Sequence, residues 1–310
     1  MDIRNLKDRI ASRVMCTLCM AVVGLAFLMA FGLFLKARPV LSLRGIFNVL
    51  FSVTWHPTQG HFGLASFIMG TLWVTGIAML FAVPLSICTA VYISEYAHRR
   101  TRTLIRPVID VLAGVSPVIY GVWGVIAIVP IVRDRLMPFL SSRFPFFPFA
   151  SDNYTGYSAL SAGIVLAVMI SPVIISVTES VIREVPLGVR EASLALGATK
   201  WQTVKHAVLK KAWPGIIAAV MLGLARAFGE TIAVLMVAGC ALGFVTKSIF
   251  DPAYPLPALI ANTYGEMMSV PLYDAAIMLA AFILLAVTAA FNMVGWRILL
   301  RIEKEGFSDG

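Results

Sequence analysis

Residues 14–35 read VMCTLCMAVVGLAFLMAFGLFL and carry no charged side chain. A helix rises about 1.5 Å per residue, so this run is long enough to cross the roughly 30 Å apolar core of a bilayer. The basic residues before it would also suit a signal peptide. However, no cleavage site ends the run and Lys36 follows it directly, so we expect an uncleaved first transmembrane helix.

The rest of the chain has the same apolar character. Of its 310 residues, 59% are hydrophobic and 13% are charged, and the mean hydropathy is +0.88. A soluble domain carries about a quarter of charged residues, so this chain cannot cover a folded surface with polar groups. We predict an all-α polytopic membrane protein with about six transmembrane helices, at residues 14–35, 65–94, 107–132, 158–181, 215–243 and 272–296.

The formal net charge is +9. The Lys and Arg residues that carry it lie between the predicted spans and not along one polar face, which argues against nucleic-acid binding. Seventeen of the 25 Lys and Arg residues fall in the N-terminus, the 95–106 loop, the 182–214 loop and the C-terminal tail. Seven fall in the three opposite loops. Because cytoplasmic loops are enriched in Lys and Arg, we expect both termini in the cytoplasm and the chain in the inner (plasma) membrane.

We expect no catalytic and no metal site. Cys16 and Cys19 have a metal-like spacing, but no second pair or nearby histidine completes a site, and His56 and His61 alone do not make one. An intramembrane enzyme is the alternative from another class. It would need a nucleophile with its base, or metal-ligand spacing, inside a span, and no predicted span contains a histidine.

Three prolines interrupt predicted spans. Pro84, Pro117 and Pro172 each remove a backbone hydrogen bond within an apolar stretch. In lipid, the freed carbonyl must be satisfied by a neighbouring helix or by a wet cavity. A single proline can be a simple packing kink, but three in a six-helix protein suggest a lined pathway.

The 182–214 loop contains the string REASLALGATKWQTVKHAVL from Arg190 to Leu209. Residues 189–196 have helical propensity, Gly197 interrupts them and a second helix is expected from Thr199. A helix, a glycine turn and a helix make a knob that projects from the membrane face. An ordinary amphipathic interfacial segment is the plainer interpretation of the same residues.

The string E-A-S-x-x-x-G resembles the EAA loop of ABC-importer permeases, whose pattern is E-A-A, three residues and G. In that family the short helix docks into a groove of the ATP-binding subunit, so the resemblance assigns this coupling role to Glu191, Ala192 and Gly197. The family often has a Leu-Pro pair about a dozen residues beyond the glycine. Here Leu209 is followed by Lys210, so the end of the loop departs from the pattern.

A second charged group lies in the fifth predicted span, RAFGETIAVLMVAG from Arg226 to Gly239. Arg226 and Glu230 are four residues apart and would share one face of a continuous helix. Each such charge costs about 2.5–3.5 kcal/mol at mid-bilayer, so we expect the two to pair and to face the bundle interior. Either the pair is structural, or Arg226 binds or gates an anion while Glu230 orients it, because a guanidinium suits an oxyanion.

This segment resembles the R-A-x-G-E-T signature of the phosphate-specific ABC permeases, and A-V-L-M-V-A-G after G-E-T-I resembles the PstC-type subunit more than PstA. Residues 113–121 resemble the family's A-G-x-P-S-x-x-Y-G segment, with serine and proline exchanged at Ser116 and Pro117. The resemblance places Arg226, Glu230, Thr231 and Ser116 on the substrate pathway. It implies a type I ABC-importer permease fold, with residues 1–60 as an N-terminal helix and outer loop and residues 61–310 as the permease core.

The chain has no G-x-x-x-x-G-K-S/T motif, so it binds no ATP-Mg of its own and hydrolysis is expected in a separate polypeptide. The resemblance implies three partners: a second, PstA-like permease subunit, a dimeric PstB-like ATP-binding subunit and a periplasmic PstS-like phosphate-binding protein. Two alternatives stay open. One is a permease for another oxyanion, such as molybdate, tungstate or sulfate, and the other is an ion-coupled secondary carrier.

Overall fold

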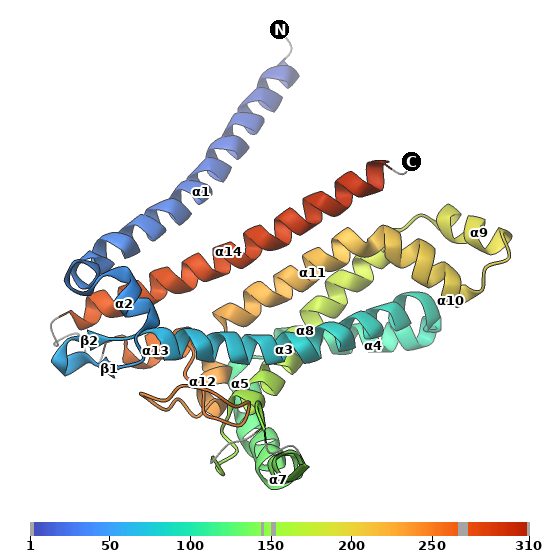
Figure 1. Cartoon of the computed structure of the whole chain (residues 1–310). Helices are drawn as coiled ribbons and strands as arrows, with labels where there is room; N and C mark the ends of the chain where they lie inside the picture. Colours follow the sequence, from blue (N-terminus) through green and yellow to red (C-terminus); the bar gives the residue numbers. More distant parts are fainter. Residues whose placement is uncertain (1–2, 144–145, 150–152, 266–271, 309–310) are drawn as a thin grey trace.

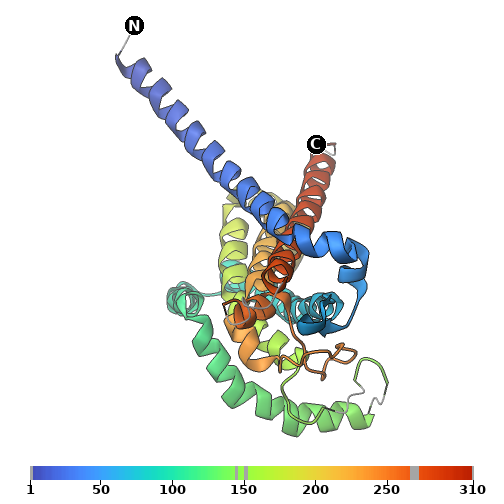
Figure 2. The same cartoon turned by 90° about the vertical axis from the view of Figure 1, so that its left-hand side faces the viewer.

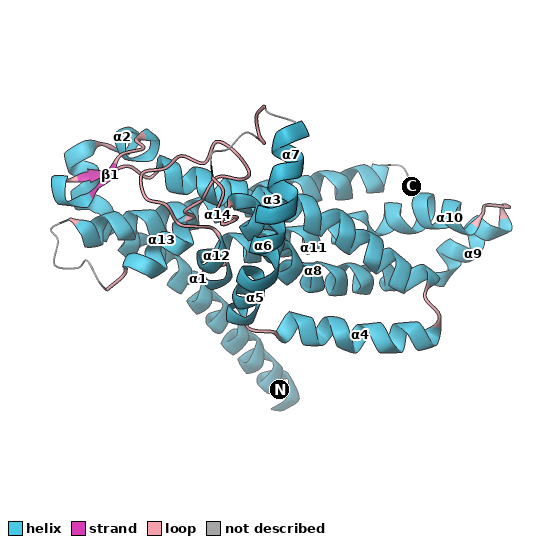
Figure 3. Ribbon diagram, turned by 90° about the horizontal axis from the view of Figure 1, so that it is seen from below, coloured by secondary structure: helices cyan, strands magenta, loops and turns pink. Residues whose placement is uncertain are grey.

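The computed structural model describes residues 3–143, 146–149, 153–265 and 272–308, and these are almost entirely helical (Figures 1 and 3). The helices and strands are α1 Ile3–Arg44, α2 Ile46–Phe51, β1 Trp55–His56, β2 His61–Phe62, α3 Ala65–Val91, α4 Arg99–Gly114, α5 Pro117–Trp123, α6 Val129–Ile131, α7 Met137–Arg143, α8 Ala159–Glu184, α9 Leu187–Ala195, α10 Lys200–Thr203, α11 Leu209–Gly229, α12 Ile232–Val237, α13 Leu256–Thr263 and α14 Tyr273–Ser308. Five-residue π turns extend α3 (Tyr92–Tyr96) and join α5 to α6, α6 to α7 and α10 to α11.

Six of these helical segments are long and apolar enough to cross a membrane. Within the described residues they are Arg9–Leu43, Ala65–Tyr96, Pro117–Arg143, Ala159–Glu184, Lys200–Gly229 and Tyr273–Arg301. The predicted all-α fold with six spans is therefore confirmed.

The third span differs from its predicted position of 107–132. Helix α4 ends at Gly114, and Val115 and Ser116 are extended, with ψ of 135° and 139°. The cause is Pro117, which is the first residue of α5, because a proline disfavours helical backbone in the residue before it. The membrane span therefore begins at Pro117, whereas Pro84 and Pro172 stay inside continuous helices.

The fifth span also differs, because the prediction treats residues 215–243 as one helix. Helix α11 ends at Gly229, Glu230 is extended with ψ of 124°, and the short α12 begins at Ile232. Beyond α12 the chain runs through irregular backbone to α13. The third and fifth predicted spans are thus each interrupted at one point, and both interruptions carry residues that the sequence marks as candidate site residues.

Helix α8 is the central element of the bundle. Two-thirds of its most apolar stretch is buried inside this chain, and it packs along the length of α3. A glycine allows the close approach, because a Cβ on Gly163 of α8 would lie 2.5 Å from Cγ2 of Ile77 on α3. Residues of α3, α5, α8 and α12 form the largest apolar core, which includes Val165, Ile170 and Val234.

Helix α1 extends away from this core (Figure 2). None of its most apolar stretch is buried inside the chain. Only its last part is attached, through Ala37 and Val40 in a second core with α13 and α14 and through Phe34, whose ring lies 5.7 Å from that of Phe282. In a bilayer, this apolar surface is covered by lipid or by another subunit.

Replacing Gly163 with leucine should separate α3 from α8, because the new side chain would overlap Ile77. Overpacking of this kind costs about 1–3 kcal/mol, so we expect a lower midpoint of thermal unfolding in detergent. The control is Gly76→Leu on α3, where the space around the glycine is open. Equal stability of the two variants would contradict the described α3–α8 packing.

Candidate functional site

The interruptions of the third and fifth spans are brought together by the packing of α5 against α12. A Cβ on Gly121 of α5 would lie 2.5 Å from Sδ of Met236 and 3.3 Å from Cα of Ala233, so a side chain at this position would crowd α12. A second close contact follows at Gly124, where a Cβ would lie 2.9 Å from Cγ1 of Val237. The two interruptions therefore lie at the starts of two helices that pack together, α5 and α12, and we call them the helix-break junction (115–116 and 229–231).

Tyr120 closes one side of the junction. Its hydroxyl donates a 2.8 Å hydrogen bond to the carbonyl oxygen of Leu112, in the last turn of α4, and the side chain is buried. The bond ties α5 back to α4 across the extended residues.

Arg226 lies in the last turn of α11 and is partly buried. A cation at this position complements the carbonyl groups at the C-terminal end of the helix. The structure gives its guanidinium no carboxylate within ion-pair distance among the described residues. The predicted pairing of Arg226 with Glu230 is therefore wrong.

Glu230 has another partner because the helix has already ended. Its Oε1 accepts a hydrogen bond of 3.2 Å from the backbone N–H of Ala233, so the carboxylate caps the first turn of α12. Next to it, the hydroxyl of Thr231 donates to the carbonyl of Gly229 at 3.3 Å. Both side chains thus satisfy backbone groups that the interruption of the helix leaves open.

Ser116 lies on the other side of the junction, at the N-cap of α5, and its side chain is exposed. The hydroxyl makes no capping bond to α5, whereas the carbonyl of Ser116 accepts from the N–H of Ile119 at 3.0 Å. Irregular backbone at membrane depth is stable only where protein covers it or where it lines a wet cavity. Exposed Ser116 and Gly229 therefore mark a surface that needs one of these two environments.

The 182–214 loop folds as predicted into a helix, a glycine turn and a second helix. No residue of α9 is buried, and Glu191 and Ala192 lie on its exposed surface. Gly197 has φ of +83°, a left-handed conformation that glycine adopts without strain. Thr199 then caps the next helix in a reciprocal pair with Gln202.

The tip of this loop is apolar as well as exposed. Leu196 is 90% exposed, Leu187 71% and Trp201 57%. A monomer in water gains nothing from presenting such side chains, so their exposure indicates an interaction surface. We call α9 and the turn to Thr199 the coupling knob.

Two residues of α5, close to the junction, have roles that the sequence interpretation did not assign. Tyr120 and Gly121 are part of the segment that carries the family resemblance, but nothing local indicates that one closes a helix break and the other admits a second helix. Within the described residues, no three His, Cys, Asp or Glu side chains gather as they would to hold a metal ion.

Comparison with known proteins gives consistent matches. The family model for the binding-protein-dependent transport system inner membrane component matches residues 82–298. The phosphate transport system permease protein PstC of Xylella fastidiosa is 34% identical, over 98% of this chain and 95% of its own length. The probable phosphate transport system permease protein PstC of Methanocaldococcus jannaschii is 33% identical, over 97% of both chains.

The fold also resembles a solved structure. A chain of the MetNI methionine ABC transporter, in an inward-facing conformation, aligns with a TM-score of 0.53 and 21% identity. The alignment covers 75% of this chain and 93% of the other. At this identity the likeness concerns the fold alone.

Substitutions at Glu230 should separate its capping role from a role of its charge. Glu230→Ala removes the acceptor for the N–H of Ala233 and should lower the stability of the folded chain by about 1 kcal/mol, the usual cost of a lost cap. Glu230→Gln keeps an acceptor oxygen and should stay within about 0.5 kcal/mol of the wild type. The measurement is thermal unfolding in detergent, with Glu184→Ala as the control for a lost exposed carboxylate. A glutamine variant as unstable as the alanine variant would refute capping.

Proposed function

The chain belongs to the family of binding-protein-dependent transport system inner membrane components, and we propose that it is the PstC-type permease subunit of an ATP-driven phosphate importer. It is a multi-pass protein of the inner membrane and not an enzyme. The observation that carries the proposal is the coincidence, in one chain, of an exposed coupling knob with an arginine at an interrupted membrane helix. Relatives named phosphate permeases over nearly the full length support the substrate.

The coupling knob is the docking element for the ATP-binding subunit. Glu191, Ala192 and the turn at Gly197 present an exposed surface on which no part of the described chain packs. Because this chain has no phosphate-binding loop, ATP-Mg is bound and hydrolysed by a dimeric PstB-like partner. The knob then receives the movement of that partner and passes it to the bundle.

Arg226 is the residue that binds the anion. An isolated cation in a poorly solvated site raises the local potential, which favours a phosphate anion with several acceptor oxygens. Thr231 and Ser116 add hydroxyl donors on the two sides of the junction. Glu230 contributes by shaping the backbone under Arg226, because its carboxylate is engaged by α12.

One subunit supplies only half of a pathway. The exposed residues of the junction need a second wall, which we assign to a PstA-like permease subunit. A periplasmic PstS-like protein delivers phosphate to the outer loops, and both termini of this chain lie in the cytoplasm. In this arrangement residues 61–310 are the permease core, and residues 1–60 are an added helix with its outer loop.

Two alternative functions, a permease for another oxyanion and an ion-coupled carrier, predict different results in one uptake assay. A permease for molybdate, tungstate or sulfate would use the same fold, and competition by these oxyanions against radiolabelled phosphate separates them. An ion-coupled carrier would transport without the ATP-binding subunit. The coupling knob disfavours a carrier, because such a protein needs no docking surface for a motor.

Replacing Arg226 with glutamine should reduce ATP-dependent phosphate uptake by about tenfold to a hundredfold, because the variant loses charge-assisted hydrogen bonds to the anion. The measurement is uptake in cells or proteoliposomes, with co-purification of the partners as the test of assembly. The control is Arg135→Gln, an exposed arginine outside the junction. Normal uptake by the Arg226 variant would argue decisively against its assignment.

Replacing Glu191 with lysine should abolish co-purification of the ATP-binding subunit, since the change reverses a charge in the centre of the proposed docking surface. The chain should still insert and pair with its second permease subunit. Glu184→Lys makes the same charge change at the end of α8, outside the coupling knob, and should keep the ATP-binding subunit bound. Retention by the Glu191 variant, or loss in both, would contradict the docking site.

A further inference from the structure

The coupling knob is attached to the bundle by an ion pair that crosses between elements. Arg190 of α9 donates to Oε1 of Glu95 from Nη2 at 2.8 Å and from Nε at 3.3 Å. The two side chains are 17% and 10% exposed, so the pair is well shielded at the face of the bundle. Glu95 belongs to the π turn Tyr92–Tyr96 that ends α3.

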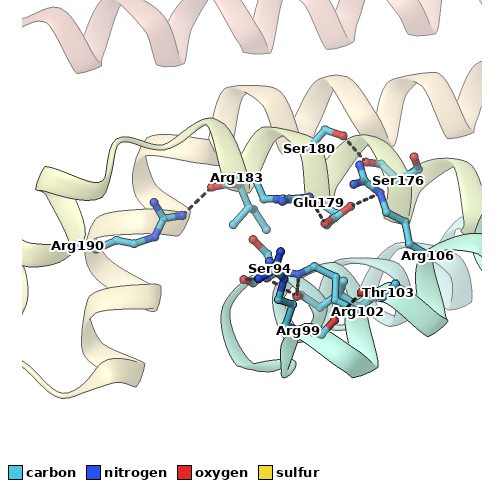
Figure 4. Close-up of polar contacts among 12 residues, drawn as sticks. Ser94, Arg99, Arg102, Thr103, Arg106, Ser176, Glu179, Ser180, Arg183 and Arg190 are labelled. Atoms are coloured by element: carbon cyan, nitrogen blue, oxygen red, sulfur yellow. Dashed lines mark hydrogen bonds and ion pairs between the residues drawn. The ribbon is translucent and has the colours of Figure 1, made fainter.

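Arg190 also holds the last turn of α8. Its Nη2 donates to the carbonyl oxygen of Ile182 at 2.9 Å, and its Nη1 donates to that of Val185. Figure 4 shows Arg190 extending from α9 toward this turn. One guanidinium therefore connects α9, the end of α8 and the end of α3.

The π turn of α3 is also held by other residues. From α4, Arg102 donates to the carbonyl oxygen of Ile93 from Nε at 3.0 Å and also bonds the carbonyl of Ser94. From α10, Nζ of Lys200 lies 4.8 Å from the ring centroid of Tyr96. The turn is thus fixed between the knob and α4, and Figure 4 shows Arg102 on the α4 side.

Packing continues from this turn toward the helix-break junction. Ile93 is buried in one cluster with Ile109 of α4 and Ile175 of α8. The adjacent Ile174 packs against α11 at Gly223, where a Cβ would lie 2.6 Å from its Cδ1. Gly223 lies about one turn before Arg226, so the contacts join the knob to the site through α3 and α8.

We propose that Arg190 is a positioning residue that makes the coupling knob and the cytoplasmic end of α3 move as one body. Movement of the knob then reaches the junction through α3 and α8, in addition to the direct continuation of the chain into α11. The inference rests on the proposed function, because it takes the knob as the part that the ATP-binding subunit displaces. Arg190 touches neither phosphate nor ATP in this scheme.

The test uses the complete transporter in proteoliposomes, with phosphate uptake and ATP hydrolysis measured on the same sample. Arg190→Gln should keep the ATP-binding subunit and its hydrolysis, because the exposed residues of α9 are unchanged. The phosphate moved per ATP hydrolysed should fall about tenfold, within the range of coupling between distant sites. The charge exchange Arg190→Glu with Glu95→Arg should recover a substantial part of this ratio.

The matched control is Arg183→Gln. This substitution removes the same charge at the same face of the bundle. The partner of Arg183, at 3.3 Å, is Glu179 of the same helix α8, so no connection to α9 is lost. The phosphate moved per ATP hydrolysed by the Arg183→Gln transporter should equal that of the wild type. An unchanged ratio for Arg190→Gln, or an equal fall for Arg183→Gln, overturns the proposal.

If Arg190→Gln does not assemble, Glu95→Gln removes the same pair from the α3 side and leaves α9 intact. An unchanged ratio for that variant also overturns the proposal. A wild-type complex that hydrolyses ATP without moving phosphate refutes phosphate as the transported substrate, and not the proposed role of the ion pair.

A distance measurement tests the ion pair without any transport. The four native cysteines are replaced by alanine, and spin labels are placed at Gly188→Cys and Tyr92→Cys, both at exposed positions. The distance between the labels should stay constant between the nucleotide-free and ATP-bound complex, and should change when Arg190→Gln is added. A distance that changes in the wild type refutes a rigid connection.

Discussion

The backbone hydrogen bonds of membrane helices are the constraint on which this structure depends. Inside a bilayer, each N–H and C=O must find a partner in the protein or in a wet cavity, and continuous helices meet this requirement. The chain breaks the rule at two points, before Pro117 and after Gly229. At both points other groups take over: the Tyr120 hydroxyl bonds a carbonyl of α4, and the Glu230 carboxylate bonds the first turn of α12.

The packing of α5 on α12 joins the two helices that begin at the interruptions, with Ser116 at one and Glu230 and Thr231 at the other. Glycines at 121 and 163 allow close packing, with α8 as the central support. Arg226 remains as a charge without a carboxylate partner among the described residues, which agrees with the proposed anion site better than with an internal ion pair. The exposed side of the junction is the surface on which the proposed second permease subunit would pack.

The same helices link this place to the coupling knob. α11 connects them through the chain, and α8 connects them through packing, with the Arg190–Glu95 ion pair at the cytoplasmic end. The knob itself is held by few contacts and exposes apolar side chains, which suits an element that another subunit moves. An ion pair at its base and exposure at its tip are the two features on which the proposed transmitting role rests.

Composition and hydropathy alone determined that the chain is a six-span helical membrane protein, because the length of each apolar run and the scarcity of charge are local properties. The glycine turn at Gly197 and the candidate residues Glu191 and Arg226 could likewise be identified from local patterns. Local patterns could not predict the relation of Arg226 to Glu230. Residues four positions apart share a helix face only if the helix is continuous between them. Only the structure shows that the helix ends at Gly229, where the side chains of Glu230 and Thr231 satisfy the freed backbone groups. Tertiary packing also brought Gly121 to Met236 and Arg190 to Glu95, across distances in sequence that no local pattern spans.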